Sequence, residues 1–354
     1  MYWIKLYNKM VLVCILKERK CKMMTNSGRF VNDFLNCKRL YKNETETNVA
    51  IAALYTTMNP FDKKPFIKTT ENSSASFRPD FFKEIVNQAL LEQLLKVERY
   101  SDKQLNNAIQ LINHLNYLPI CPSNLYISYL WAANLTPSHF YQQLILRTKR
   151  MHYWLYDTRL NYQTIESYSM LYATMYKSVA KVDLKRKYCQ QLLESWSIDV
   201  NIVRQLSLFL PLLSNRLVAD IQKLQDLVSY LERFELFYCQ SVEQWLILSF
   251  LACCDLSVEQ QIDRLLLTTS QLKHADRFRK QAPNDPIYFL FAAILSADYT
   301  KEKQELKNRR RVQTAELIVL EALTQYCDKY LGELAIDFKE ENKRKMRDEL
   351  FIRS

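Results

Sequence analysis

The sequence contains the stretch Phe291-Ala292-Ala293-Ile294-Leu295, a short apolar block with two small residues at its centre. Related blocks occur earlier in the chain, the first of them at Ile51-Ala52-Ala53-Leu54-Tyr55. The central positions of the blocks are Ala53, Ala133, Ala173, Leu213, Ala252 and Ala292. The first interval is twice as long as the later ones, which are 40, 40, 39 and 40. Such a regular return indicates repeated structural units, each built around a short apolar helix.

A longer and more polar helix is predicted after most of these blocks. One of them shows apolar residues at helical spacing: Leu217, Ile221, Leu224, Leu227, Val228 and Leu231. The longer helices are predicted at residues 138–156, 183–197, 216–235, 257–275 and 312–331. A pair of such helices buries both faces only when it stacks on neighbouring pairs. We therefore predict an all-α protein of stacked helical hairpins with a period of about 40 residues, similar to an α-solenoid or a helical-layer array. A helical bundle without repeats is the alternative.

Residues at the predicted helix starts agree with this interpretation. Ser257 and Gln260 have the spacing of a capping box, in which each side chain bonds the backbone N–H of the other. Pro286 is expected to open a helix over 287–297. The N–H groups of the first helical turn have no acceptor within the helix, so a proline there loses no hydrogen bond. A helix over 82–96 would fill the double-length interval between Ala53 and Ala133.

The scarcity of glycine excludes several classes of enzyme. The chain of 354 residues contains only Gly28 and Gly332. A G-x-G-x-x-G fingerprint, a phosphate-binding P-loop and a G-x-S-x-G nucleophile elbow are therefore all absent. Sheets rich in tight hairpins are disfavoured as well, since their turns rely on glycine. The share of hydrophobic residues, 48%, is that of an ordinary globular protein.

The chain is predicted to divide into five segments. These are a doubtful N-terminal extension (1–24), a first helical hairpin (25–58), a Pro/Ser/Thr-rich loop (59–80), a helical-repeat domain (81–335) and a charged C-terminal helix or tail (336–354). Met23 or Met24 would be a natural start, and residues 1–22 carry +5 of the formal net charge of +11. No run reaches the roughly 18 apolar residues of a membrane span, and no signal-peptide cleavage site follows residues 11–16. We expect a cytoplasmic protein.

No metal or cofactor site is expected from the cysteines and histidines. The nine cysteines are scattered without a C-x-x-C pair, which favours reduced, buried thiols. The histidines, at positions 114, 139, 152 and 274, are all more than four residues apart. His152 lies near Asp157, Arg159 and Glu166, which is compatible with an acid/base site or with an ordinary surface helix.

Two basic clusters are the candidate contact residues for nucleic acid or an acidic partner. Arg147, Lys149 and Arg150 fall on one predicted longer helix, and Lys185, Arg186 and Lys187 fall on the next. On adjacent repeats they would form a positive stripe that phosphates could follow. A third cluster, Arg309-Arg310-Arg311, precedes the last predicted helix. The aromatic residues near the first two clusters are Tyr153, Trp154, Tyr156, Tyr162 and Tyr188, which could stack on bases.

Three function classes follow from these observations. The leading interpretation is a non-catalytic scaffold that binds a protein or peptide, because the 22 tyrosines suit interfaces and stacked helices offer a concave surface. The second is a helical-repeat protein that associates with nucleic acid through its basic helix faces. The third is an enzyme with a pocket between helices, although no catalytic motif in the sequence supports this class.

The block Ala50-Ile51-Ala52-Ala53-Leu54-Tyr55-Thr56-Thr57-Met58 resembles the early A-x-L-Y-T-M helix of a bacterial family, the domain of unknown function 4003. The apolar blocks at 130–135, 208–213 and 246–256 are similar in layout to the repeated helices of that family, over most of residues 29–330. The chain departs from the family by having almost no glycine at its turns. The resemblance implies an all-helical fold and assigns no catalytic residues.

Overall fold

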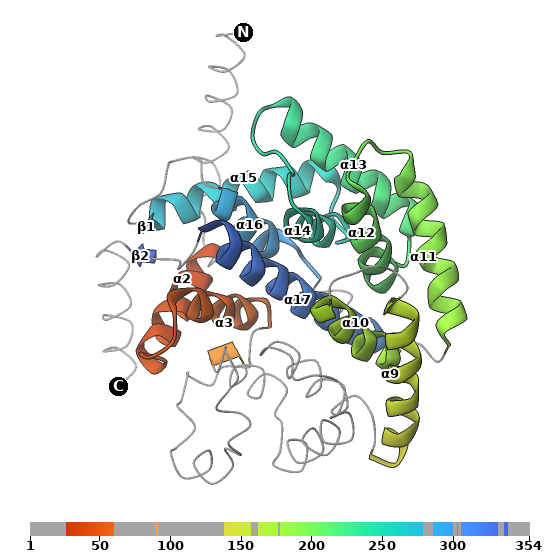
Figure 1. Cartoon of the computed structure of the whole chain (residues 1–354). Coiled ribbons are helices and arrows are strands. Elements are labelled where there is room, and N and C mark those ends of the chain that lie inside the picture. The colour runs from red at the N-terminus through yellow and green to blue at the C-terminus, as the bar shows by residue number, and fades with distance from the viewer. Residues whose placement is uncertain are drawn as a thin grey trace.

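The computed structural model of this protein describes residues 26–59, 89–90, 138–156, 162–175, 178–278, 286–299, 303, 306–331 and 336–338. Within these residues the protein is all-α apart from two strands of three residues each (Figure 1). The predicted all-α fold is therefore confirmed. The predicted segment 1–24, almost all of the loop 59–80 and the block at Ala133 lie outside the described residues.

Ten of the described helices form five hairpins, each with a more exposed helix followed by a more deeply buried one. The first members are α2 (Asn26–Leu40), α9 (Tyr141–Tyr156), α11 (Val179–Glu194), α13 (Leu217–Arg233) and α15 (Val258–Ala275). The buried members are α3 (Glu46–Met58), α10 (Tyr162–Met175), α12 (Val200–Leu213), α14 (Val242–Ala252) and α16 (Pro286–Ser296). The central residues Ala53, Ala173, Leu213, Ala252 and Ala292 all lie in buried members and are themselves buried.

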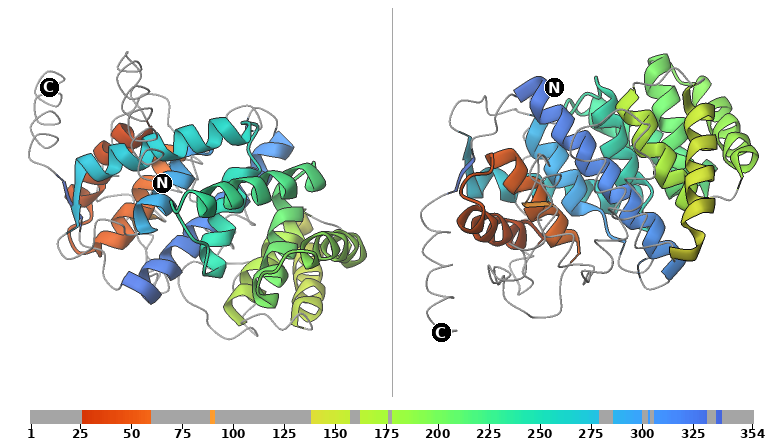
Figure 2. Two further views of the ribbon diagram at one scale, coloured as in Figure 1. Left: turned by 90° about the horizontal axis from the view of Figure 1, so that it is seen from above. Right: turned by 60° about the horizontal axis from the view of Figure 1, so that its bottom comes forward.

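The hairpins stand side by side in two rows (Figures 1 and 2). The outer row runs α9, α11, α13, α15, α2, and the inner row runs α10, α12, α14, α16, α3. The N-terminal hairpin α2–α3 therefore packs against α15 and α16, which come much later in the sequence.

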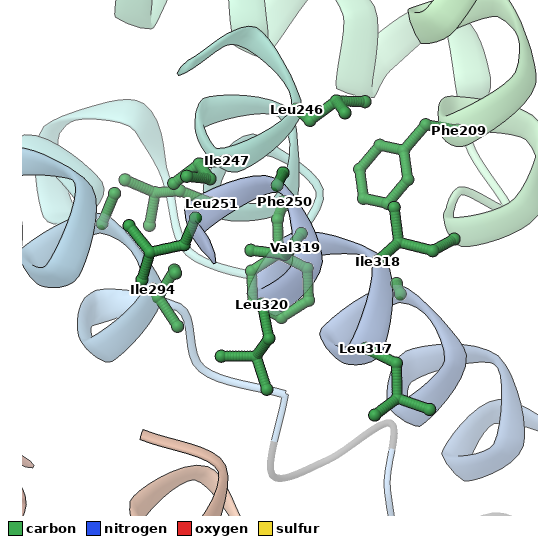
Figure 3. Packing of buried hydrophobic residues seen from close by; sticks show 14 of the residues in the cluster. Phe209, Leu246, Ile247, Phe250, Leu251, Ile294, Leu317, Ile318, Val319 and Leu320 are labelled. Atoms are coloured by element: carbon green, nitrogen blue, oxygen red, sulfur yellow. The ribbon is translucent and has the colours of Figure 1, made fainter. Parts of the chain in front are cut away.

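Helix α17 (Leu306–Tyr326) lies across the inner row and contacts α12, α14 and α3 (Figure 2). All nine of its residues from 312 to 320 are buried. Their side chains meet apolar side chains of α12, α14 and α16, among them Phe209, Phe250 and Ile294 (Figure 3). The centre of the core is thus made by the inner row and α17 together.

A buried polar cluster fixes α17 to the N-terminal hairpin. The Lys303 ammonium lies 2.5 Å from Glu316 Oε1 and donates to the Met58 carbonyl oxygen at 2.9 Å. It also donates to Asn59 Oδ1 at 3.0 Å, while Asn59 Nδ2 donates to Glu316 Oε2 at 3.1 Å. Each charged group therefore has several partners, which is what burial of an ion pair requires.

The predicted capping signals are present. The backbone N–H of Gln260 donates to Ser257 Oγ, and the N–H of Ser257 donates to Gln260 Oε1. Pro286 is the first residue of α16, as predicted. A second capping box, at Ser241 and Gln244, opens α14 and adds to the predicted one.

Helix α13 ends without the glycine that usually closes a helix. Glu235 has a φ of 54°, the left-handed conformation that favours glycine. Its N–H donates to the Glu232 carbonyl oxygen, and the Leu236 N–H donates to the Leu231 carbonyl oxygen. These two bonds form a Schellman motif with a glutamate in the strained position.

The structure differs from the sequence prediction in the starts of two helices and in the presence of two short strands. Helix α11 begins four residues before the predicted start, and α17 begins six residues early. The inner helices α10, α12, α14 and α16 begin at residues 162, 200, 242 and 286, respectively. The successive intervals are 38, 42 and 44 residues, and a regular period near 40 residues stays a prediction. Strands β1 (Asp276–Phe278) and β2 (Ile336–Phe338) pair antiparallel. Strands as short as these give no periodic signal.

Candidate functional site

Helix α9 is amphipathic, and its outward face carries apolar side chains. Its buried side, formed by Tyr141, Leu144, Thr148, Met151 and Leu155, packs into the hairpin. Leu146, Arg150 and Tyr153 follow one another at i, i+4 and i+7, so they share the opposite face. All three are exposed, with Leu146 at 55% and Tyr153 at 72% of their full accessible area.

Helix α11, the next helix of the outer row, repeats this arrangement. Its buried side consists of Val182, Cys189 and Leu193. Leu184, Lys187 and Tyr188 stand at i, i+3 and i+4 and are exposed, Leu184 at 69%. Both helices thus place a leucine, a cation and a tyrosine toward solvent.

We call the exposed side chains of these two helices the α9–α11 surface. Its apolar and basic members are Leu146, Arg150, Tyr153, Tyr156, Leu184, Lys185, Lys187 and Tyr188. Ten large apolar side chains are exposed among the described residues, and six belong to these helices or to the preceding turn η1 (Ser138–Phe140). Single exposed apolar residues are ordinary, whereas a concentration of them beside cations is typical of an interaction site.

Asp183 joins the two helices at their contact. Its Oδ1 accepts from Trp154 Nε1 of α9 at 3.2 Å and from Arg186 Nη2 at 3.1 Å. Its Oδ2 lies 2.8 Å from Lys187 Nζ. The Arg186 guanidinium also lies 6.0 Å from the Trp154 ring centre. Partial burial by itself would raise the pKa of Asp183, but the hydrogen bonds from Lys187, Arg186 and Trp154 together lower it.

The structure places the two predicted basic clusters on neighbouring helices, since α9 and α11 are in contact. Arg147 is half-buried and donates to the Gln143 carbonyl oxygen of its own helix at 3.3 Å. Lys149 is half-buried, whereas Arg150 and Lys185 are exposed. Arg186 and Lys187 are both paired with Asp183, a carboxylate of the protein itself.

The third basic cluster belongs to a different part of the fold. Arg309 and Arg311 are on α17, and the Arg311 guanidinium donates to Asn215 Oδ1. Sequence reasoning missed Leu146 and Leu184, which it did not separate from the core leucines. The available signal was their position, because each lies on the polar side of an amphipathic helix.

Other candidate chemistry receives little support from the geometry. Burial raises the pKa of the Cys189 thiol to about 12 and raises the pKa of the Cys253 thiol well above its usual value, so both thiols stay protonated and weakly nucleophilic. Burial lowers the pKa of His152, and the side chains of its predicted partners lie outside the described residues. His274 Nδ1 donates to the Ser270 carbonyl oxygen at 2.6 Å in the last turn of α15.

Within the described ranges, no cluster of His, Cys, Asp or Glu could hold a metal ion, and no helix could span a membrane. In comparisons with known proteins, no family model, curated protein or solved structure matches the chain. The resemblance to the domain of unknown function 4003 therefore stays a prediction.

Proposed function

We propose that this protein is a non-catalytic binding module, and that its α9–α11 surface binds an acidic segment of a partner protein. One observation carries the proposal: exposed leucines and tyrosines are concentrated beside lysines and arginines on two neighbouring helices. Burial of the apolar side chains would supply affinity, and the cations would select an acidic partner.

The leucines favour a protein over a nucleic acid. Leu146 and Leu184 are aliphatic and have no ring on which a base could stack. A partner segment with apolar side chains of its own would remove both leucines from water. Full burial of a leucine is worth about 1.5–3 kcal/mol, so burial of the exposed parts of both leucines would contribute favourably to binding.

The position of α17 supports a surface on the outer row. A concave inner face is where stacked helices usually hold a peptide. Here α17 contacts α12, α14 and α3 on that side, and its residues 312–320 are buried. A partner would displace part of the core to bind there, whereas the α9–α11 surface is accessible as it stands.

Selection from a library of displayed random peptides tests the proposal. The wild-type chain is expected to enrich peptides that combine Asp or Glu with Leu, Phe or Trp. The enriched peptides should bind the variant L146S/L184S at least tenfold more weakly. V218S is the matched control, because Val218 is an equally exposed aliphatic residue on α13. Enrichment of peptides that bind L146S/L184S as well as wild type would overturn the proposal.

Single-stranded nucleic acid is the second candidate ligand. Tyr153, Tyr156 and Tyr188 are exposed beside Arg150 and Lys187, and this combination of aromatic rings and cations can stack bases and neutralise phosphates. A labelled oligothymidine would then bind with an affinity that falls steeply with salt. Binding lost in Y153A/Y188A but retained in L146S/L184S would favour nucleic acid over protein.

A further inference from the structure

The turn between α13 and α14 carries a second set of exposed aromatic and charged side chains. Among the described residues, four large apolar side chains are exposed outside α9, α11 and η1, and two of them, Phe234 and Tyr238, lie in this turn. Glu232 and Glu235, on either side of Phe234 in the sequence, are exposed as well. The turn therefore combines carboxylates with aromatic rings, the chemistry that we propose for the partner of the α9–α11 surface.

The Phe234 ring is held in a defined position at the surface. Its centre lies 4.5 Å from the centre of the Tyr230 ring, one turn earlier in α13. The central carbon of the Arg233 guanidinium lies 5.8 Å from the centre of the Phe234 ring. The Phe234 N–H donates to the Tyr230 carbonyl oxygen at 3.1 Å. A ring fixed in this way loses little conformational freedom when a partner covers it, which favours binding.

Glu235 occupies a backbone position that costs stability. Its φ of 54° belongs to the left-handed region, in which glycine is favoured. The Glu235 side chain is exposed, so packing in the core does not account for a glutamate at this position. Strained residues are concentrated at functional sites, where the strain is offset by what the residue does. Contact of the Glu235 carboxylate with a cationic partner would provide such a role.

The turn and the α9–α11 surface have opposite net charge. Helices α9 and α11 together hold seven Lys and Arg residues against Asp183 and Glu194, a formal net charge of +5. Residues 232–235 hold two glutamates and Arg233, a formal net charge of −1. Both surfaces are exposed in a single copy of the chain, so neither covers the other there. Complementary charge would bring the turn of one copy to the α9–α11 surface of another.

We propose that the partner segment is the α13–α14 turn of a second copy of this chain. The inference rests on the proposed function. Phe234 and Tyr238 of one copy contact the leucines and tyrosines of the α9–α11 surface of the next, and Glu232 and Glu235 contact the cations beside them. The contact joins two different surfaces, so a two-fold dimer contains it twice, whereas a ring or a filament contains it once per copy.

Sedimentation velocity of the full chain tests the proposal. Concentrations from about 1 μM to about 200 μM cover the range in which weak protein contacts form. Wild type should associate as its concentration rises, and less at high salt. E232Q/E235Q removes both negative charges and should weaken association about threefold to tenfold, the range for two exposed ion pairs. D226N, which changes another exposed carboxylate of α13, is the matched control.

The variant E235G separates binding from folding. Glycine relieves the backbone strain, so this variant should unfold at a higher temperature than wild type. It should nevertheless associate about threefold more weakly, because it lacks one of the two carboxylates. A glutamate with a purely structural role would leave association unchanged. If E235G and E232Q/E235Q both associate as strongly as wild type, the proposal is wrong.

Mixing two defective chains tests which surfaces meet. L146S/L184S alters the α9–α11 surface and leaves the turn intact, whereas F234S/E235Q does the reverse. Each variant alone should stay monomeric, and the equimolar mixture should form pairs at the highest concentrations, because each chain keeps the surface that the other lacks. A mixture that stays monomeric where wild type associates would overturn the proposal.

The outcomes also distinguish this proposal from the proposed function. A wild-type chain that is monomeric at every concentration but binds the selected acidic peptides would overturn self-association alone. A chain that neither associates nor binds such peptides would overturn the proposed function as well.

Discussion

Helices α14 and α11 illustrate two ways of using a helix in one fold. In α14 every residue from 244 to 252 is buried, and the helix is surrounded by α12, α13, α16 and α17. In the longer α11 only Val182, Cys189 and Leu193 are buried. The stability of the protein therefore depends on the inner row and α17, whereas the outward faces of α11 and α9 can change with little effect on the fold. A surface of that kind is free to be adapted for binding.

The largest expected effect is on the core side of this comparison. Phe250 on α14 is completely buried, and the centre of its ring lies 4.8 Å from the centre of the Tyr299 ring. The backbone carbonyl oxygen of Phe250 accepts a hydrogen bond from the Tyr299 hydroxyl. The substitution F250A should reduce the free energy of unfolding by about 3–5 kcal/mol because it leaves a cavity. Urea denaturation measures the change. Y153A on α9 is the control. An equal loss of unfolding free energy in that variant would show that α14 and the outward face of α9 do not differ in their contribution to stability.

The buried cluster at Lys303 should give the next largest effect. K303M leaves the Glu316 carboxylate without its cation and should destabilise the protein by about 2–3 kcal/mol. The double variant K303M/E316L should recover most of this loss, because no buried charge is then left alone. A double-mutant cycle measured by urea denaturation tests the coupling. Additive losses would show that the two side chains do not act as a pair.

The third prediction concerns the pH dependence of stability. Burial raises the pKa of Glu321 on α17 from 4.5 to about 7, although Gln325 donates a hydrogen bond to its carboxylate. Stability contributed by the protonated acid is present below pH 4.5 and is lost as the pH rises through 7. E321Q should therefore match wild type near pH 4 and exceed it by about 2 kcal/mol at pH 8. Urea titrations at several pH values provide the test, and parallel curves would contradict it.

A smaller gain is expected at the end of α13. E235G places glycine at the left-handed position of the Schellman motif and should stabilise the protein by about 1 kcal/mol. Thermal unfolding should shift upward by about 2 °C for a chain of this size. E232G, three residues earlier within the helix, should instead destabilise by about 1 kcal/mol. A loss of stability in both variants would mean that the Glu235 side chain outweighs its backbone strain.

The smallest change in stability should come from the α9–α11 surface. L184S removes an exposed aliphatic side chain and should alter the free energy of unfolding by less than about 0.5 kcal/mol. The same variant should lose affinity for the peptides selected on wild type. Destabilisation by more than about 1 kcal/mol would indicate that Leu184 packs within the fold and would undermine the contrast between α11 and α14.

The parts of the fold that follow from local pattern could be predicted from the sequence. The apolar blocks at Ala252 and Ala292 identify inner helices, and Ser257 and Pro286 mark helix starts, because these signals lie within a few adjacent turns. The position of α17 could not be predicted in this way. The pairing of Lys303 with Asn59 and Glu316 joins segments from opposite ends of the described chain, and no local pattern encodes it.

The basic clusters of the candidate surface could be predicted from the sequence, whereas its exposed leucines could not. The cations at 147–150 and 185–187 are visible as clusters, and their helices do lie side by side. Whether a leucine is buried depends on the direction it faces within the assembled hairpin. Leu184 faces solvent while Leu193, further along the same helix, is fully buried. The ion pairs of Arg186 and Lys187 with Asp183 likewise depend on side-chain geometry, which a count of charged residues in the sequence does not reveal.

The central position of α17 has a consequence for synthesis of the protein. The hairpin α2–α3 leaves the ribosome early, but its packing partners α15, α16 and α17 are made only after most of the chain has been synthesised. Until residues 306–326 have emerged, the inner helices α12, α14 and α3 lack the packing partner that α17 provides. The chain therefore folds late, after contacts distant in sequence become available, and nascent chains stopped before α17 should depend on chaperones or aggregate.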